Sequence, residues 1–203
     1  MRRRLALIAL LFFVLTICAC SGTEVKRSVM DDNIFFSSSK PKISIKIDPS
    51  FKMAKEDEKS TLGFDTRGGE KASNVKIEQY IFSGKGSNKA KAVMIEFQEL
   101  TSPKWKFNPT LFKAPNVYDS GSLKIHGKSY QYMVFAFFHK SGAYNIVRGY
   151  GRRVGSEDNA MIRIYYLERV AGDWSNLKML NPQQKRYLND FIEASKKDIE
   201  ILK

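Results

Sequence analysis

The chain has 203 residues, a formal net charge of +13 and 43% hydrophobic residues, enough for one domain with a sizeable core. Its two cysteines, Cys18 and Cys20, lie within the first twenty residues, so the rest of the chain has no disulfide, thiol nucleophile or thiolate metal site. The basic excess favours anionic partners, but the lysines are spread through every segment, and a merely solvated surface is the simpler interpretation.

The start of the chain has the pattern of a secretory signal. Three arginines at positions 2–4 precede an apolar run from Leu5 to Ile17. A run of roughly 13 residues is typical of a signal peptide, whereas a membrane-spanning helix needs about 20. The sequence therefore predicts a signal peptide over residues 1–19.

The end of this segment, Ile17-Cys18-Ala19-Cys20, resembles the bacterial lipobox. The resemblance implies that Cys20 becomes the first mature residue and carries the acyl chains, palmitate among them, that anchor the protein to a membrane. Ser21 stands where an aspartate would commonly retain such a lipoprotein at the inner membrane. The resemblance thus points to the outer membrane, with the domain facing the periplasm. The alternative is an ordinary signal peptide whose cysteines are incidental.

The remaining chain divides by composition into a tether and a domain. Residues 20–40 are expected to form the lipidated N-terminus and a flexible tether, because charged residues and serines dominate there. The apolar island Ile34-Phe35-Phe36 allows a second interpretation, in which it docks on the domain. Residues 41–203 are expected to form one globular domain.

Alternation of apolar and polar residues predicts the strands of this domain. Residues 52–71 are polar and contain glycine, and they are expected to form a loop. Short turn segments join the later strands, which should therefore pair antiparallel. The expected strands are Ile43–Ile47, Asn74–Phe82, Ala92–Leu100, Tyr130–Phe138, Tyr144–Val154 and Met161–Val170, with a short one at Leu123–His126.

Two further segments complete the expected fold. Three prolines in Thr101–Ser120 exclude a central strand, so this segment is predicted to be an ordered cover over one sheet face. Asn181 suits a helix N-cap and Pro182 the first helical position, and apolar residues then recur at helical spacing to Leu202. The prediction is an α+β fold: an antiparallel sheet of about six to seven strands packed against a C-terminal amphipathic helix.

The layout of this domain resembles a known family. A strand at Ile43–Ile47, then Asp48-Pro49-Ser50-Phe51, further antiparallel strands and a closing amphipathic helix are similar to the Mog1/PsbP-type sandwich. Members of such families are mostly non-enzymatic helpers that bind a protein partner or assist assembly. The resemblance implies an accessory role of that kind.

The best candidate binding residues are basic and aromatic. Arg148, Tyr150 and Arg152 occupy alternate positions of one predicted strand and so share a face, and Arg163 on the neighbouring strand is expected to join them. Guanidinium groups beside a tyrosine suit phosphate or carboxylate, which predicts a face for an anion or a protein partner. The alternative is an outward sheet face whose arginines are merely solvated.

No catalytic signature is recognisable. His126 and His139 are the only histidines, each lies near a lysine, and neither belongs to an H-x-x-x-H arrangement. We therefore expect no catalytic residue, no metal and no cofactor.

The expected function is a lipid-anchored, non-catalytic binding or assembly accessory of the cell envelope. Its partner would be an envelope protein or an anionic envelope component, and nucleic acid is disfavoured by location. Two alternatives remain open: an envelope hydrolase whose histidine or carboxylate site is assembled by the fold, and a purely structural or surface-exposed protein.

Overall fold

The computed structural model describes residues 25–63, 73–101, 107, 111–112, 114, 116–139, 142–154 and 159–202. The predicted signal peptide, Cys20 and most of the proline-containing segment after Leu100 lie outside these ranges.

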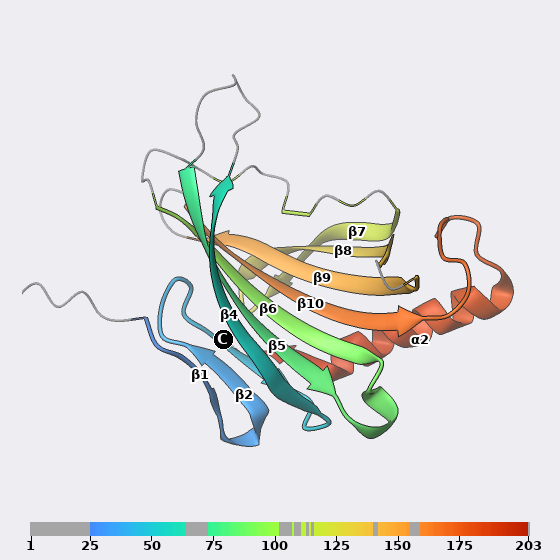
Figure 1. Ribbon diagram of the computed structural model, residues 1–203, viewed down its shortest axis with the longest axis horizontal. Coiled ribbons are helices and arrows are strands. Elements are labelled where there is room, and N and C mark those ends of the chain that lie inside the picture. The colour runs from blue at the N-terminus through green and yellow to red at the C-terminus, as the bar shows by residue number, and fades with distance from the viewer. Residues whose placement is uncertain are drawn as a thin grey trace, which may run out of the picture.

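The larger of two antiparallel sheets has seven strands in the order β4-β5-β6-β10-β9-β8-β7, and Figure 1 shows that it is twisted and curved. Consecutive strands pair with each other except β6 and β7, which lie apart because β10 and β9 stand between β6 and the β8–β7 end of the sheet. The strands are β4 Phe51–Gly63, β5 Ser73–Gly84, β6 Lys91–Leu100, β7 Val117–Ile125, β8 Lys128–Phe138, β9 Tyr144–Val154 and β10 Ala160–Val170, with the short 3-10 helix η2 Gly86–Asn88 between β5 and β6.

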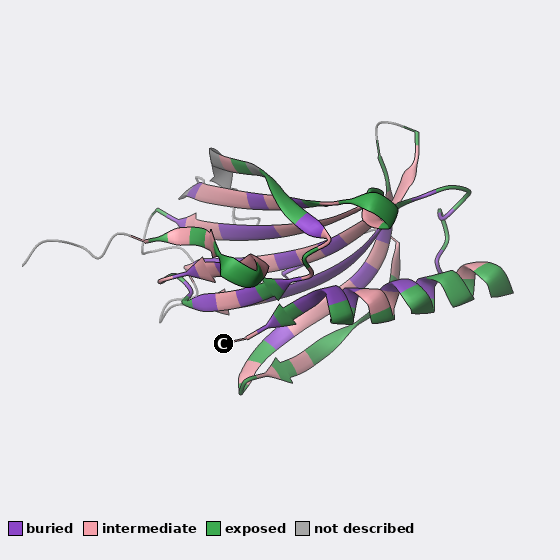
Figure 2. Ribbon diagram, turned by 90° about the horizontal axis from the view of Figure 1, so that it is seen from below, coloured by how far each residue is buried: buried purple, intermediate pink, exposed green. Residues whose placement is uncertain are grey.

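A smaller sheet and a helix lie against one face of the large sheet (Figure 2). The helix α2 spans Pro182–Asp198. The small sheet has the order β1-β2-β3-β11, and its strands come from the two ends of the described chain. Its elements are β1 Arg27–Met30, the 3-10 turn η1 Asp31–Asn33, β2 Ile34–Ser37, β3 Ile43–Ile47 and β11 Ile199–Ile201.

These observations confirm the predicted α+β class, with an antiparallel sheet packed against a C-terminal helix. The helix begins as the sequence indicated. The Asn181 side chain accepts a hydrogen bond from the main chain of Gln184, and the Gln184 side chain accepts one from the main chain of Asn181, so the two form a capping box ahead of Pro182. Leu188 and Phe191 are buried on the face that meets the sheet.

The main core lies between the two layers. Ile43, Ile45 and Ile47 of β3 are buried against alternate residues of the large sheet. Phe51 and Phe191 pack on the ring of Tyr166, which is fully buried on β10. Alternate residues of β5, β6, β8, β9 and β10 therefore form one apolar face of the large sheet. This face packs against the layer made by the small sheet and α2.

The first forty residues differ from the expected tether. Residues 27–37 form the β1–β2 hairpin, and Phe35 is completely buried against Tyr80 of the large sheet, with ring centroids 4.7 Å apart. The prediction of a flexible tether through residue 40, with the domain starting at residue 41, is therefore wrong for this stretch. Of the two interpretations of the apolar island, the docked one holds, because Phe35 fills the core beside β3.

Two other expectations are corrected by strand pairing. Residues 52–63, expected as loop, belong to β4, which lies at one end of the large sheet and pairs with β5 only. The helix ends at Asp198 rather than Leu202, because Ile199–Ile201 leave it to pair with β3.

The opposite face of the large sheet carries a small second cluster. Leu111 and Phe112 are buried there with Met161, and the Phe112 ring lies 5.9 Å from that of Tyr165. A Cβ atom at Gly149 or Gly151 would lie within 3.0 Å of the Phe112 ring, so the absence of side chains at these glycines of β9 leaves the space that the ring occupies. These two residues agree with the expected cover over one sheet face. Most other residues of the segment that was expected to form this cover lie outside the described ranges.

Acid is expected to weaken the contact between β1 and the large sheet. Burial raises the pKa of Glu78, but the hydrogen bond and charge of Arg27, together with Lys76, outweigh burial and hold this pKa below its ordinary value of 4.5. A carboxyl with a lowered folded-state pKa adds stability above its unfolded-state pKa and loses it as the pH falls through the folded value. The free energy of unfolding should therefore fall below about pH 4.5, and urea titrations should show a shallower fall for Glu78→Gln. Equal slopes for the two proteins would contradict this.

Candidate functional site

Arg148 is a basic residue placed inside the fold rather than on its surface. It lies on β9, and alternation turns it toward α2 together with Tyr150. Only 6% of Arg148 is exposed. Its Nη1 donates hydrogen bonds to the Ile192 carbonyl at 2.9 Å and to Ser195 Oγ at 3.0 Å, both on α2. The arginine therefore joins the helix to the sheet.

The charge of Arg148 has no counter-ion in the part of the chain that the structure describes, where the carboxylate ion pairs involve other cations. Its Nε is buried without a hydrogen-bond partner. The guanidinium carbon lies 4.9 Å from the ring centroid of Tyr150 and 6.0 Å from that of Tyr132, at cation–π distance. Burial of a charge without an ion-pair partner is costly. A bound anion would offset that cost, so the position of Arg148 is suited to an anion-binding site.

A pocket of about 450 Å³ opens beside this guanidinium, and we call it the β11 pocket. Its apolar walls are Leu123 and Ile125 of β7 on one side and Ile199 and Ile201 of β11 on the other. The polar groups that line it are His126, Arg148, Tyr150, Lys196 and Glu200. Two of these five groups, Arg148 and Lys196, are basic, one, Glu200, is acidic, and the lining residues beyond these five are apolar.

Tyr150 adds a neutral donor to the pocket. Burial raises the pKa of Tyr150, and the charge of Arg148 offsets only part of that rise. The phenol therefore keeps its proton at neutral pH and can donate it in a hydrogen bond.

His126 closes one end of the β11 pocket. It occupies the β7–β8 turn with a left-handed φ of 47°, ahead of Gly127 at 74°. Its Nε2 lies 3.0 Å from the Ile201 carbonyl oxygen, and since a carbonyl only accepts, Nε2 carries the proton. Sequence spacing does not indicate this contact, because it joins residues 75 positions apart.

The predicted basic face is divided by the structure. Arg148, Tyr150 and Arg152 do share one face of β9, but Arg152 lines a separate pocket of about 210 Å³, with its guanidinium 5.5 Å from the Tyr130 ring centroid. Arg163 does not join them. It pairs in register with Gly151, which points to the opposite face, and its Nη1 lies 3.4 Å from Glu96 Oε1. The four-residue site therefore reduces to Arg148 and Tyr150, joined by His126 and Lys196, which sequence spacing did not suggest.

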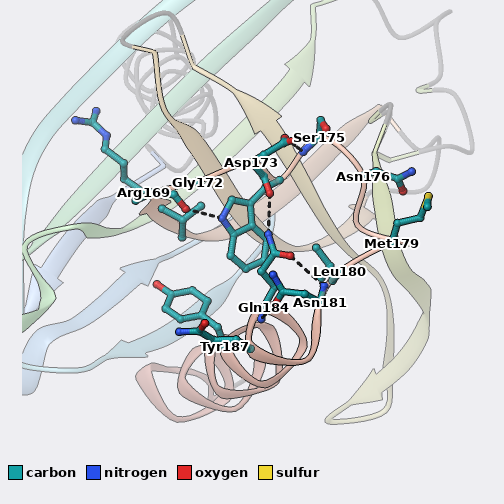
Figure 3. A pocket seen from close by; sticks show the side chains of 14 residues that line it. Arg169, Gly172, Asp173, Ser175, Asn176, Met179, Leu180, Asn181, Gln184 and Tyr187 are labelled. Atoms are coloured by element: carbon teal, nitrogen blue, oxygen red, sulfur yellow. Dashed lines mark hydrogen bonds between the residues drawn. The ribbon is translucent and has the colours of Figure 1, made fainter.

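A larger pocket, about 810 Å³, lies in the loop between β10 and α2 (Figure 3). Its polar groups are largely bonded to each other. The Trp174 indole donates to the Ala171 carbonyl at 2.9 Å, and the Gln184 side chain donates to the Asp173 carbonyl at 2.7 Å while accepting from the Asn181 main chain. Because these bonds build the loop, this pocket offers fewer free groups to a ligand than the β11 pocket.

Two kinds of feature are absent from the described residues. No cluster of three or more His, Cys, Asp or Glu side chains suited to a metal ion occurs among them. Nor does any helix in the described ranges have the length and apolar character to span a membrane.

Comparison with protein-family models, with curated proteins and with solved structures gave no match for this chain. The assignment of a function therefore depends on the residues and geometry above.

Proposed function

We propose that the protein is a lipid-anchored lipoprotein of the cell envelope that works by binding, as an accessory to envelope assembly or maintenance, without catalysis. The lipobox-like ending at Cys20 supports the anchor, and Ser21 supports the outer membrane, with the domain facing the periplasm. We also propose the Mog1/PsbP-type sandwich as its fold. The support for it is the curved antiparallel sheet with a closing helix across one face.

The observation that carries the binding function is the buried guanidinium of Arg148 beside the β11 pocket, a guanidinium that has an unbonded Nε and no carboxylate ion pair among the described residues. A buried charge without a partner lowers stability unless something else compensates it. An anionic group bound in the pocket would receive hydrogen bonds from Arg148 and Tyr150, with Lys196 nearby. The apolar walls would hold a hydrophobic part of the same ligand. The proposed partner is therefore an envelope protein or an anionic envelope component with apolar character.

Replacing Arg148 with methionine is expected to abolish binding while the free energy of unfolding stays unchanged or rises by about 1 kcal/mol. The substitution removes the buried charge and leaves no orphaned acceptor, because Ser195 Oγ still donates to the Ile192 carbonyl. Binding is measured in living cells with a photo-crosslinking phenylalanine derivative in place of Glu200, an exposed residue that lines the pocket. Mass spectrometry identifies the adduct, and urea unfolding gives the stability.

Arg152→Met is the matched control, because Arg152 lies on the same strand and face but outside the β11 pocket. The adduct should persist in this variant and disappear with Arg148→Met. An adduct that survives Arg148→Met at the same yield, or the absence of any adduct in the parent protein, would refute the proposed site.

A further inference from the structure

The β11 pocket runs along an unpaired strand edge. β11 is the last strand of the small sheet, and β3 is its one partner among the strands that the structure describes. The Asp48 N–H donates to the Asp198 carbonyl, and the Leu202 N–H donates to the Ser44 carbonyl, so residues 198 and 202 face β3. Because the direction of main-chain groups alternates along an antiparallel strand, those of Ile199 and Ile201 point away from β3.

These outward groups face the apolar walls of the pocket. Ile199 and Ile201 line one side of it, and the opposite side comes from β7, itself the end strand of the large sheet. The pocket is thus a short groove between the ends of two sheets. The imidazole of His126 bonds to the Ile201 carbonyl, and no residue in the described ranges accepts a hydrogen bond from the Ile201 N–H.

The two ends of the groove differ in charge. Arg148 bonds to Ser195, and Lys196 follows it in the last turn of α2, so both cations lie near the start of β11. His126 lies at the other end, beside Ile201. A carboxylate is therefore favoured near Ile199.

From this geometry we infer that the β11 pocket binds the free C-terminal end of an extended peptide. The peptide adds as an antiparallel strand beside β11 and accepts a hydrogen bond from the Ile201 N–H. Its terminal carboxylate reaches Arg148 and Lys196. An apolar side chain enters between the walls formed by β7 and β11. This inference rests on the proposed binding function and names its ligand class. The three residues of β11 span about 10 Å, so they contact about three residues of the peptide.

A lipid explains the groove less completely. An anionic lipid would also use the cations and the apolar walls. With its phosphate at the cations near Ile199, however, its acyl chain would lie beside Ile201, where methylenes offer the Ile201 N–H no acceptor, and a buried main-chain donor without a partner is costly. A peptide main chain supplies that acceptor, and for this reason we favour the peptide.

The experiment uses the full chain purified in detergent and two matched pools of N-acetylated hexapeptides whose last three residues are varied among Val, Ile, Leu, Phe and Ala. One pool ends in free carboxylates and the other in amides. We expect the acids to bind at least about tenfold more tightly than the amides, because the amides lack the charge-assisted hydrogen bonds. Equal affinity of the two pools, or binding by neither, would overturn the inference.

Two further measurements test the mode of binding. Lys196→Ala should weaken the binding of the acid pool by about threefold or more, whereas Lys197→Ala, the adjacent exposed lysine that does not line the pocket, should leave it unchanged. Hydrogen exchange of the Ile201 amide should slow by about tenfold or more in the complex, since strand addition gives it an acceptor. Binding that leaves this exchange rate unchanged would exclude strand addition.

A lysophosphatidylglycerol arm separates failure of the inference from failure of the proposed function. If this anionic lipid binds in a manner that Arg148→Met abolishes, while neither peptide pool binds, the pocket is a binding site but its ligand is not a peptide. If neither the lipid nor the peptides bind, and Arg148→Met leaves the yield of the crosslinked adduct in cells unchanged, both proposals fail.

Discussion

Replacing Phe35 with alanine is expected to lower the free energy of unfolding by about 3–5 kcal/mol, the usual cost of removing a fully buried phenylalanine. Phe35 is 0% exposed although it lies only eight residues after the start of β1. Its ring centroid lies 4.7 Å from that of Tyr80, 5.9 Å from Phe97 and 6.3 Å from Phe82. Removal of this ring leaves a cavity between the small sheet and the large one, and so weakens the contact that joins the two layers.

Urea unfolding followed by tryptophan fluorescence measures this effect, and Phe36→Ala is the control. Phe36 is its neighbour on β2, points the other way and is only half-buried, so its replacement should cost clearly less. If the two variants were equally stable, the β1–β2 hairpin would not be part of the core, and the tether predicted from composition would be restored.

The elements that sequence predicted best are those whose signal is local. Strands β3, β5, β6 and β10 bury mainly one face, and the resulting alternation is visible in the sequence. The helix start was equally clear, because its cap is made by three neighbouring residues. Each of these features needs only a window of a few residues to be recognised.

The elements that sequence missed depend on distant partners. β4 is an end strand, and its adjacent residues Lys52 and Met53 are both exposed, so no alternation of buried and exposed side chains marks the strand there. Ile199 and Leu202 continue the helical spacing, whereas Ile199 and Ile201 fit strand alternation, and pairing with β3 decides for the strand.

The β1–β2 hairpin did leave a signal in the sequence. Asp32 and Asn33 adopt left-handed φ values of 59° and 57°, which these residue types tolerate, so the run at 31–33 marks a tight turn between Val29 and Phe35. The Asn33 side-chain amide also lies 3.0–3.1 Å from the carbonyls of Ile47, Asp48 and Phe51. These contacts hold the hairpin against β3, and no local pattern reveals them.

The candidate site shows the same limit. Alternation along one strand correctly grouped Arg148 with Tyr150 and Arg152. It does not give the register between strands, and one step of register places Arg163 on the opposite face beside Glu96. His126 and Lys196 reach the pocket from a turn and from the helix end, so only the tertiary structure brings them to Arg148.

The corrected start of the domain changes how it would sit on a membrane. If Cys20 is lipidated, only residues 21–26 separate the lipid from β1, rather than the twenty residues of the expected tether. Six residues reach at most about 20 Å when fully extended. The small sheet would therefore stay close to the lipid surface, and a partner of the β11 pocket would have to meet the domain there.

Replacing Cys20 with serine is expected to reduce incorporation of radiolabelled palmitate to background, because serine lacks the thiol to which the lipobox resemblance assigns the lipid. Cys18→Ser is the matched control, since Cys18 is discarded with the signal peptide, and its labelling should equal that of the parent protein. Mass spectrometry of the parent protein should find an N-terminal peptide that begins at Cys20 and carries acyl chains. Each buried methylene of such chains contributes about 0.8 kcal/mol, so several chains together hold the protein at the membrane where one holds it only weakly. A bare Cys20 sulfur, a retained leader or loss of labelling in Cys18→Ser would remove the anchor from the proposal. The β11 pocket would remain to be judged on its own test, because none of its residues lies before Leu123.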